Sequence, residues 1–166
     1  MATGKRCSSE TEFAIAAVMC VLQGHANRGV FRGFSVREVA RGRHFEFRWL
    51  TDATFHLRLD ALAGTLTFSD LLPNVPYRSA MDRAFRSFVR ECTSEQLPAH
   101  RRIDRDLAQV RCRNRKGSAS LVVTAVGGDF DYATRKAISL VNEIFHGFLR
   151  GPYYAYMVEN FNEPEE

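Results

Sequence analysis

The sequence predicts an α+β protein with an antiparallel sheet of five or six strands and helices packed on one face, in the order α-β-β-β-α-β-β-α. The first supporting observation is the hydrophobic period, which is near 3.6 in three segments and two in the segments between them. The second is size, because 166 residues with 45% hydrophobic composition suit one globular domain. We therefore expect a single domain over residues 1–166, with frayed ends at 1–8 and 162–166.

The first helical segment follows Ser9. Apolar residues recur at helical spacing from Phe13 to Leu22, and Ser9-x-x-Glu12 is a capping box. Two basic residues before this run resemble the start of a signal peptide, but the acidic residues that follow them are unfavourable for one. The run is also too short to cross a bilayer. We predict a structural helix from Ser9 to about Gly24.

The middle of the chain has the period-two alternation of half-buried strands. Three strands are predicted, at 44–49, 55–60 and 65–69, and an earlier strand at 35–40 would turn at Arg41-Gly42. These strands form a meander in which aromatic and aliphatic side chains share one face and charged side chains share the other.

Pairing Phe47 with Leu57 keeps every aromatic side chain of the first predicted hairpin on the core face. This register leaves Thr51-Asp52-Ala53 as the connecting loop. On the other face it places polar residues across from one another, with Glu46 opposite Arg58 and Arg48 opposite His56. Opposite charges that face each other across strands stabilise a sheet by roughly 0.2–1 kcal/mol.

A second helix and a loop come next. Pro76 is predicted at the first helical position. The apolar stripe of this helix runs from Tyr77 to Cys92, and Asp82 lies among the residues of its wet side. The segment 93–106, which contains a proline, is predicted to be a loop.

The second hairpin pairs 110–113 with 119–125 through a turn at Arg115-Lys116-Gly117-Ser118. The span from Arg101 to Lys116 holds seven basic and two acidic residues, a net +5 against +4 for the whole chain. The positive potential of the molecule is therefore expected to be local.

The last long helix is predicted to begin at Asp129 or Asp131, where a carboxylate favours a helix N-terminus. Gly151-Pro152 is predicted to end it. Residues 153–161 then form a short further helix or an extension. Their aromatic side chains either close the core or contribute to an interface.

Arginine dominates the basic residues, with 20 Arg and 3 Lys. Arginine binds carboxylates and phosphates through a planar fork of donors, although such a bias also follows from genome composition alone. If both hairpins join one sheet, their arginines project from the same face. The predicted binding residues of this basic surface are Arg48, Arg58, Arg101, Arg102, Arg105, Arg111, Arg113, Arg115 and Lys116.

The sequence contains no nucleophile elbow, phosphate-binding loop, dinucleotide fingerprint, zinc-protease motif or EF-hand loop. The best catalytic candidate is His56 with Arg48 and Glu46, as acid or base; alternatively, these residues only furnish the wet face of a sheet. We predict no catalytic residue, no cofactor and no metal site, because the five His and four Cys lack the usual spacings. The cysteine pattern favours the reducing cytoplasm.

The order of elements resembles the bacterial type III secretion chaperone fold, shared with the YbjN family of small bacterial proteins, over Ser9 to Leu149. The segments Gly64–Val75 and Tyr132–Phe145 are also similar to segments of uncharacterised bacterial families. The resemblance implies a homodimer that offers an apolar surface to an extended protein segment, and it implies no site residue. Secretion chaperones are typically acidic, whereas this chain is basic.

From these observations we expect a non-enzymatic, cytoplasmic, protein-binding or chaperone-like module that is homodimeric, has a protein partner and has no contact with membranes. The alternative is a nucleic-acid-associated protein that uses the Arg-rich sheet face. Its binding would be directed to the phosphate backbone, because the aromatic rings lie on the core side of the strands. An uncharacterised enzyme comes third.

Overall fold

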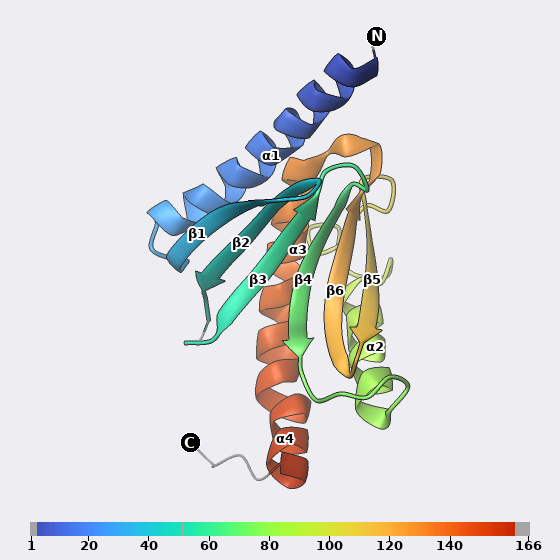
Figure 1. Ribbon diagram of the computed structural model, residues 1–166. Coiled ribbons are helices and arrows are strands. Elements are labelled where there is room, and N and C mark those ends of the chain that lie inside the picture. Colours follow the sequence, from blue (N-terminus) through green and yellow to red (C-terminus); the bar gives the residue numbers. More distant parts are fainter. Residues whose placement is uncertain (1–2, 51, 162–166) are drawn as a thin grey trace.

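The computed structural model describes residues 3–50 and 52–161 and contains one six-stranded antiparallel sheet with helices behind it (Figure 1). The strand order across the sheet is β1-β2-β3-β4-β6-β5. The elements are α1 (Thr3–Asn27), β1 (Arg32–Val39), β2 (Gly42–Arg48), β3 (Thr54–Asp60), β4 (Thr65–Leu72), α2 (Ala80–Cys92), β5 (Ala108–Arg115), β6 (Ser118–Ala125), η1 (Val126–Gly128), α3 (Phe130–Ile144), η2 (Phe145–Tyr153) and α4 (Tyr154–Phe161). The α+β class and the antiparallel sheet are confirmed, and the earlier strand of the meander is present as β1.

The helices lie on one face of the sheet, where α1 and α3 pack behind the strands, and the other face is left uncovered (Figure 1). The core between these layers contains fully buried side chains from the strands, such as Phe45, Phe68 and Leu121, together with Leu22 of α1 and Ile144 of α3. Burying side chains of this size stabilises the fold by roughly 1.5–3 kcal/mol each. Because strand residues alternate between faces, this core determines which side chains remain on the uncovered face.

The register of the first hairpin differs from the prediction by two residues. Phe47 lies opposite Phe55, not Leu57, and Phe45 lies opposite Leu57. The pairing ends at Arg48 and Thr54, so the connection is longer than predicted and includes Leu50 in a left-handed conformation with φ of 66°. An even shift leaves every side chain on its predicted face but changes its cross-strand partner.

Helix α1 begins earlier and ends later than predicted. It starts at Thr3, so Ser9-x-x-Glu12 lies inside the helix and is not its N-terminal cap. It also continues through Gly24 to Asn27. The fraying predicted for 1–8 and 162–166 lies partly outside the described residues, and the backbone from Thr3 onward is helical. No described helix has the length and apolar character that a membrane span requires.

Helix α2 begins at Ala80 rather than at Pro76, because Ser79 is its N-cap and accepts a 3.2 Å hydrogen bond from the backbone N–H of Asp82. Tyr77 therefore precedes the helix, and its side chain is exposed instead of contributing to the apolar stripe. The exposed loop that follows the helix is present as predicted, from Thr93 to the start of β5.

Asp82 was predicted on the wet side of α2 but is 1% exposed. Its Oδ2 accepts hydrogen bonds from the backbone N–H of Arg78 (3.0 Å) and from Nε of Arg86 (3.2 Å), and its Oδ1 accepts one from Asn114 of β5 (3.2 Å). These bonds compensate the burial of the carboxylate. Asp82 thereby attaches the start of α2 to the edge strand of the sheet.

Helix α3 begins as predicted, with the Asp129 side chain accepting a 3.0 Å hydrogen bond from the N–H of Tyr132. The prediction that Gly151-Pro152 ends this helix is wrong. The chain continues through the π-helical η2, which contains Pro152, into α4, and α4 confirms the further helix or extension predicted for residues 153–161. Proline has no backbone N–H and so cannot take part in the regular hydrogen bonding of an α-helix, and Pro152 lies in this π-helical segment.

Two tyrosines of the C-terminal helical segment are tied to the domain itself. The hydroxyl of Tyr153 donates to the carbonyl of Pro73 (2.7 Å), and that of Tyr156 donates to the carbonyl of Asn74 (2.8 Å). Of the two roles considered for this aromatic cluster, these contacts favour closure of the domain over an interface. These hydrogen bonds connect the segment from η2 to α4 with the turn between β4 and α2.

Candidate functional site

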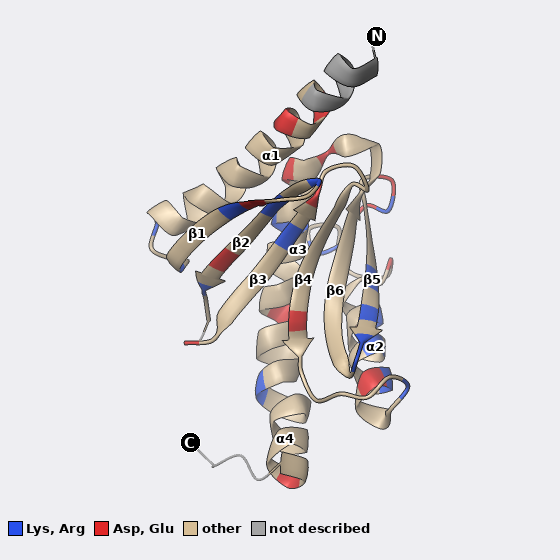
Figure 2. Ribbon diagram, in the orientation of Figure 1, with Lys and Arg blue, Asp and Glu red and all other residues tan. Residues whose placement is uncertain are grey.

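The uncovered face of the sheet is polar because each strand presents its non-core residues there. The cross-strand register aligns one row of side chains across all six strands. This row consists of Arg37, His44, Arg58, Thr67, Val122 and Arg111. Arginines of β3 and β5 therefore project from one face, as predicted, with β4 and β6, which carry no Lys or Arg, between them (Figure 2).

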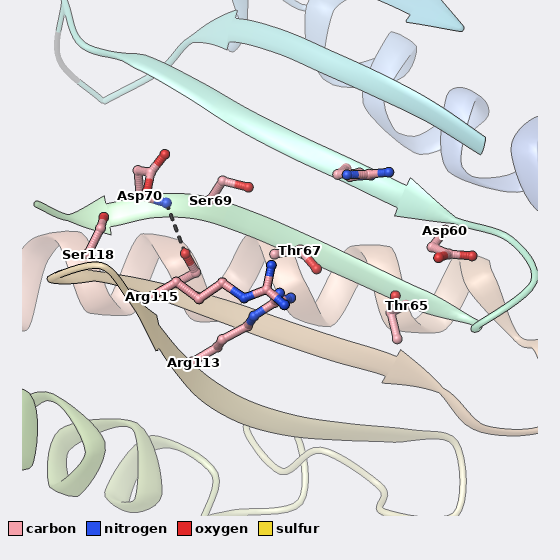
Figure 3. A pocket seen from close by; sticks show the side chains of 10 residues that line it. Asp60, Thr65, Thr67, Ser69, Asp70, Arg113, Arg115 and Ser118 are labelled. Atoms are coloured by element: carbon pink, nitrogen blue, oxygen red, sulfur yellow. Dashed lines mark hydrogen bonds between the residues drawn. The ribbon is translucent and has the colours of Figure 1, made fainter. Parts of the chain in front are cut away.

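A hollow of about 370 Å³ lies on this face over β3, β4, β6 and β5 (Figure 3). The side chains of the central strands are short, whereas Arg58 on one side and Arg113 and Arg115 on the other are long, which makes the surface concave. We call it the arginine hollow; it is lined by Arg58, Asp60, Thr65, Thr67, Ser69, Asp70, Arg113, Arg115, Ser118 and Ser120. Figure 3 shows Arg113 and Arg115 extending toward the hydroxyl-bearing central strands.

The lining of the arginine hollow has three arginines and two acidic residues, Asp60 and Asp70, and is therefore positive by one charge. Burial, and then the charges of Arg115, Arg111 and Arg58, lower the pKa of Arg113. Within the described ranges 3–50 and 52–161, none of the three arginines of the hollow takes part in an ion pair. Guanidinium groups without acidic partners retain donors for an anionic ligand.

Of the two acidic residues that line the hollow, Asp60 has its carboxylate engaged by neighbouring groups, whereas the hydrogen bond of Asp70 comes from its backbone. Asp60 Oδ1 lies 3.2 Å from Nε of Arg41 and accepts hydrogen bonds from the N–H groups of Leu62 and Ala63. The backbone N–H of Asp70 donates to the hydroxyl of Ser120 at 3.0 Å (Figure 3). The hydroxyl of Ser118 is buried and has no hydrogen-bond partner among the described residues.

The residues of the predicted basic surface do not all lie together: one group is on the open face of the sheet, and the others are in the loop after α2 and at the β5–β6 turn. Arg58, Arg113 and Arg115 line the arginine hollow, and Arg111 follows on the same face. Arg48 is on this face too but lies beside Gly33 of the edge strand β1. These residues gather on the sheet, in contrast to the loop residues of the same prediction.

The loop arginines lie elsewhere. Arg101 pairs with Glu143 of α3 at 3.5 Å, and Arg105 pairs with Glu95 within the loop at 3.3 Å. Arg102 lines a separate depression that includes Tyr132 of α3. Lys116 occupies the tip of the β5–β6 turn, where its φ is 51°. The span from Arg101 to Lys116 therefore does not form one surface.

The Ser and Thr residues of the hollow were not identified from the sequence, because hydroxyls on exposed strand faces carry no distinctive sequence signal.

A second polar group lies beside the arginine hollow and comprises His44, Glu46 and His56, which we call the histidine cluster. His44 Nε2 is 3.2 Å from His56 Nδ1, and Glu46 Oε1 lies 3.5 Å and 3.6 Å from these two nitrogens. Burial, and then the charge of Arg37 and the proximity of His56, lower the pKa of His44. The predicted group of His56, Glu46 and Arg48 is thus only partly assembled, with His44 in place of Arg48.

Comparison of the chain with models of protein families, with curated proteins and with solved structures found no match. The resemblance of its element order to secretion chaperones and the YbjN family therefore stays a prediction.

Proposed function

We propose that this protein is a non-enzymatic binding module that holds an acidic segment of a protein partner on the open face of its sheet. The observation that carries the proposal is the arginine hollow, in which Arg58, Arg113 and Arg115 lie together and form no ion pair within the described part of the chain, although Asp60 and Asp70 belong to the same lining. Arginine forks pair with carboxylates through two parallel hydrogen bonds. The surrounding serine and threonine hydroxyls are suited to the backbone and carboxylate groups of an extended peptide.

The nucleic-acid alternative has less support from the same face. The large aromatic side chains of β2, β3 and β4 are buried, including Phe47, Phe55 and Phe68. A sheet that binds single strands needs exposed rings on which bases stack. Contacts to phosphates alone would remain, with a strong dependence on salt.

The proposal is tested by fluorescence anisotropy with a labelled glutamate-rich peptide. Replacing Arg58, Arg113 and Arg115 together by Ala is expected to weaken binding at least about 10-fold, since hydrogen bonds to charged groups contribute roughly 1.5–3 kcal/mol each. The matched control replaces Arg101, Arg102 and Arg105 by Ala and removes the same number of charges outside the hollow.

Equal losses in the two triple variants would contradict a specific site and indicate a response to net charge alone. A single-stranded DNA oligonucleotide of equal charge serves as the competing probe. Tighter binding of the oligonucleotide, weakened steeply by salt, would replace the protein partner with nucleic acid.

We also propose that the module is cytoplasmic and homodimeric. The three described cysteines, Cys20, Cys92 and Cys112, are all free, which suits a reducing compartment.

An exposed apolar surface supports the dimer. Phe13 of α1 is 81% exposed and Leu62 is 56% exposed, and both line one hollow with Phe130. Sedimentation equilibrium of the wild type and of Phe13→Asp tests the dimer. A wild-type monomer at all concentrations would exclude the dimer, and a dimer that is unaffected by the substitution would exclude this surface as its interface.

A further inference from the structure

The histidine cluster has the composition of a transition-metal site. Two imidazole nitrogens and one carboxylate oxygen come from adjacent strands of one sheet face, because His44 and Glu46 are two residues apart on β2 and His56 of β3 lies opposite Glu46. Histidine with a carboxylate is a common ligand set for zinc and for other borderline divalent metals. Rigid neighbouring strands position such a set more accurately than loops do.

The distances between the three donor atoms match those of ligands around one small ion. The separations are 3.2, 3.5 and 3.6 Å. With metal–ligand bonds of about 2.0–2.1 Å, two ligands of a tetrahedral zinc ion lie roughly 3.3–3.4 Å apart. We propose that His44 Nε2, His56 Nδ1 and Glu46 Oε1 bind one divalent transition-metal ion, with Zn²⁺ as the reference metal.

Such an ion would keep at least one coordination position open. All three donors belong to one face of the sheet, and this face is not covered by a helix (Figure 1). Side-chain exposure is 15% for His44, 41% for Glu46 and 38% for His56, so the ion can enter from solvent. Three protein ligands and an open position are typical of zinc sites that bind an exogenous ligand, unlike closed structural sites with four.

The charges around the cluster determine which cations it would select. His44 is flanked across the strands by Arg37 on one side and Arg58 on the other. These arginines oppose any dication, and a single carboxylate does not compensate them. Hard ions such as Ca²⁺ and Mg²⁺ prefer several oxygen ligands, whereas the two imidazoles favour Zn²⁺, Ni²⁺, Cu²⁺ and Co²⁺. The same arginines would favour an anion as the exogenous ligand of the bound metal.

The test uses the full chain, purified without a histidine tag and treated with a chelator. Zn²⁺ binding is measured by calorimetry, and Co²⁺ binding by visible absorption. We expect one ion per chain for the wild type. His44→Ala, His56→Ala and Glu46→Gln should each weaken Zn²⁺ binding by at least about 10- to 100-fold, since changes even to groups behind metal ligands have effects of that size.

His100→Ala is the matched control, because His100 is an exposed histidine of the loop after α2, and it should bind Zn²⁺ as the wild type does. Circular dichroism of the metal-free variants shows whether each remains folded. Arg58→Gln should raise Zn²⁺ affinity roughly 2- to 10-fold by removing a repulsive charge. Absence of saturable binding to the wild type, or equal binding by His44→Ala and His100→Ala, would overturn the proposal.

Discussion

The β2–β3 and β5–β6 hairpins have the same alternation of apolar and polar residues, but their charged side chains on the open face have different surroundings. On β2–β3, Glu46 lies between two histidines and Asp60 pairs with Arg41. On β5–β6, the arginines of β5 lie beside serine and threonine, and their charges disfavour one another. Charged groups without ion-pair partners, more than net charge, therefore distinguish a candidate binding surface from an ordinary solvated one.

The largest effect is expected where β5 is attached to α2. Asp82→Ala removes a buried carboxylate together with its hydrogen bonds from Arg86, Asn114 and the backbone N–H of Arg78, so the unfolding free energy should fall by about 3–5 kcal/mol. Asp131→Ala is the control: it removes an exposed i,i+4 pair with Arg135 in the first turn of α3, worth about 0.5 kcal/mol or less. Chemical denaturation measures both, and a similar loss in the two variants would exclude an anchoring role for Asp82.

The covered face of β5 should show its burial through thiol chemistry. Burial raises the pKa of Cys112 to about 11, whereas Cys20 is exposed. Only the thiolate reacts with iodoacetamide. At pH 8 the raised pKa of Cys112 lowers its thiolate fraction, and burial also limits access, so Cys112 should be alkylated at least about 10-fold more slowly than the exposed Cys20. Mass spectrometry of the labelled peptides measures the rates, and comparable rates in the folded protein would contradict the burial of this strand face.

A smaller effect separates the connections of the two hairpins. Lys116 and Gly117 both have positive φ, at 51° and 75°, which defines a tight two-residue turn that sets the register. Gly117→Val should lower the unfolding free energy by about 1–2 kcal/mol, because a side chain disfavours the left-handed region. Asp52→Ala, in the longer β2–β3 connection, should change it by about 0.5 kcal/mol or less. Thermal unfolding measures both variants, and equal shifts in melting temperature would contradict the proposal that the tight turn constrains the chain more than the longer connection does.

The smallest effects should have opposite signs in the two hairpins. Arg113→Gln relieves repulsion and should raise stability by up to about 0.5 kcal/mol, whereas Glu46→Gln removes the negative charge beside two histidines and should lower it by a similar amount. Salt screens repulsion, so added salt should stabilise the wild type more than Arg113→Gln. Denaturation at two salt concentrations measures this, and a loss above about 1 kcal/mol for Arg113→Gln would mean that Arg113 has a stabilising partner.

The faces of the strands were predictable and the register was not, for a physical reason. Core burial imposes a period of two, and any even shift satisfies it equally well. The turn at Lys116-Gly117 leaves no such freedom, but the five-residue connection after Arg48 does. The two-residue error placed His56 opposite Arg48 instead of Glu46, and this concealed the histidine cluster.

The arginine hollow was predictable only in part. Alternation indicated that Arg58, Arg111 and Arg113 share a face if both hairpins join one sheet. The concave shape depends on β6 pairing with β4, which places short side chains between the arginines, and no local pattern encodes that pairing. Proximity in sequence wrongly grouped Arg101 with the arginines of β5, because the loop places Arg101 beside Glu143 of α3, behind the sheet.

The hydroxyls of Tyr153 and Tyr156 have a practical consequence for anyone who shortens this chain. A boundary drawn at Gly151-Pro152, where the composition suggests a natural stop, would delete both donors to the carbonyls of Pro73 and Asn74. The turn before the Ser79 N-cap would then lose both hydrogen bonds to the C-terminal helical segment, although no residue of the sheet had been removed. Expression boundaries and C-terminal fusions should therefore begin beyond Phe161.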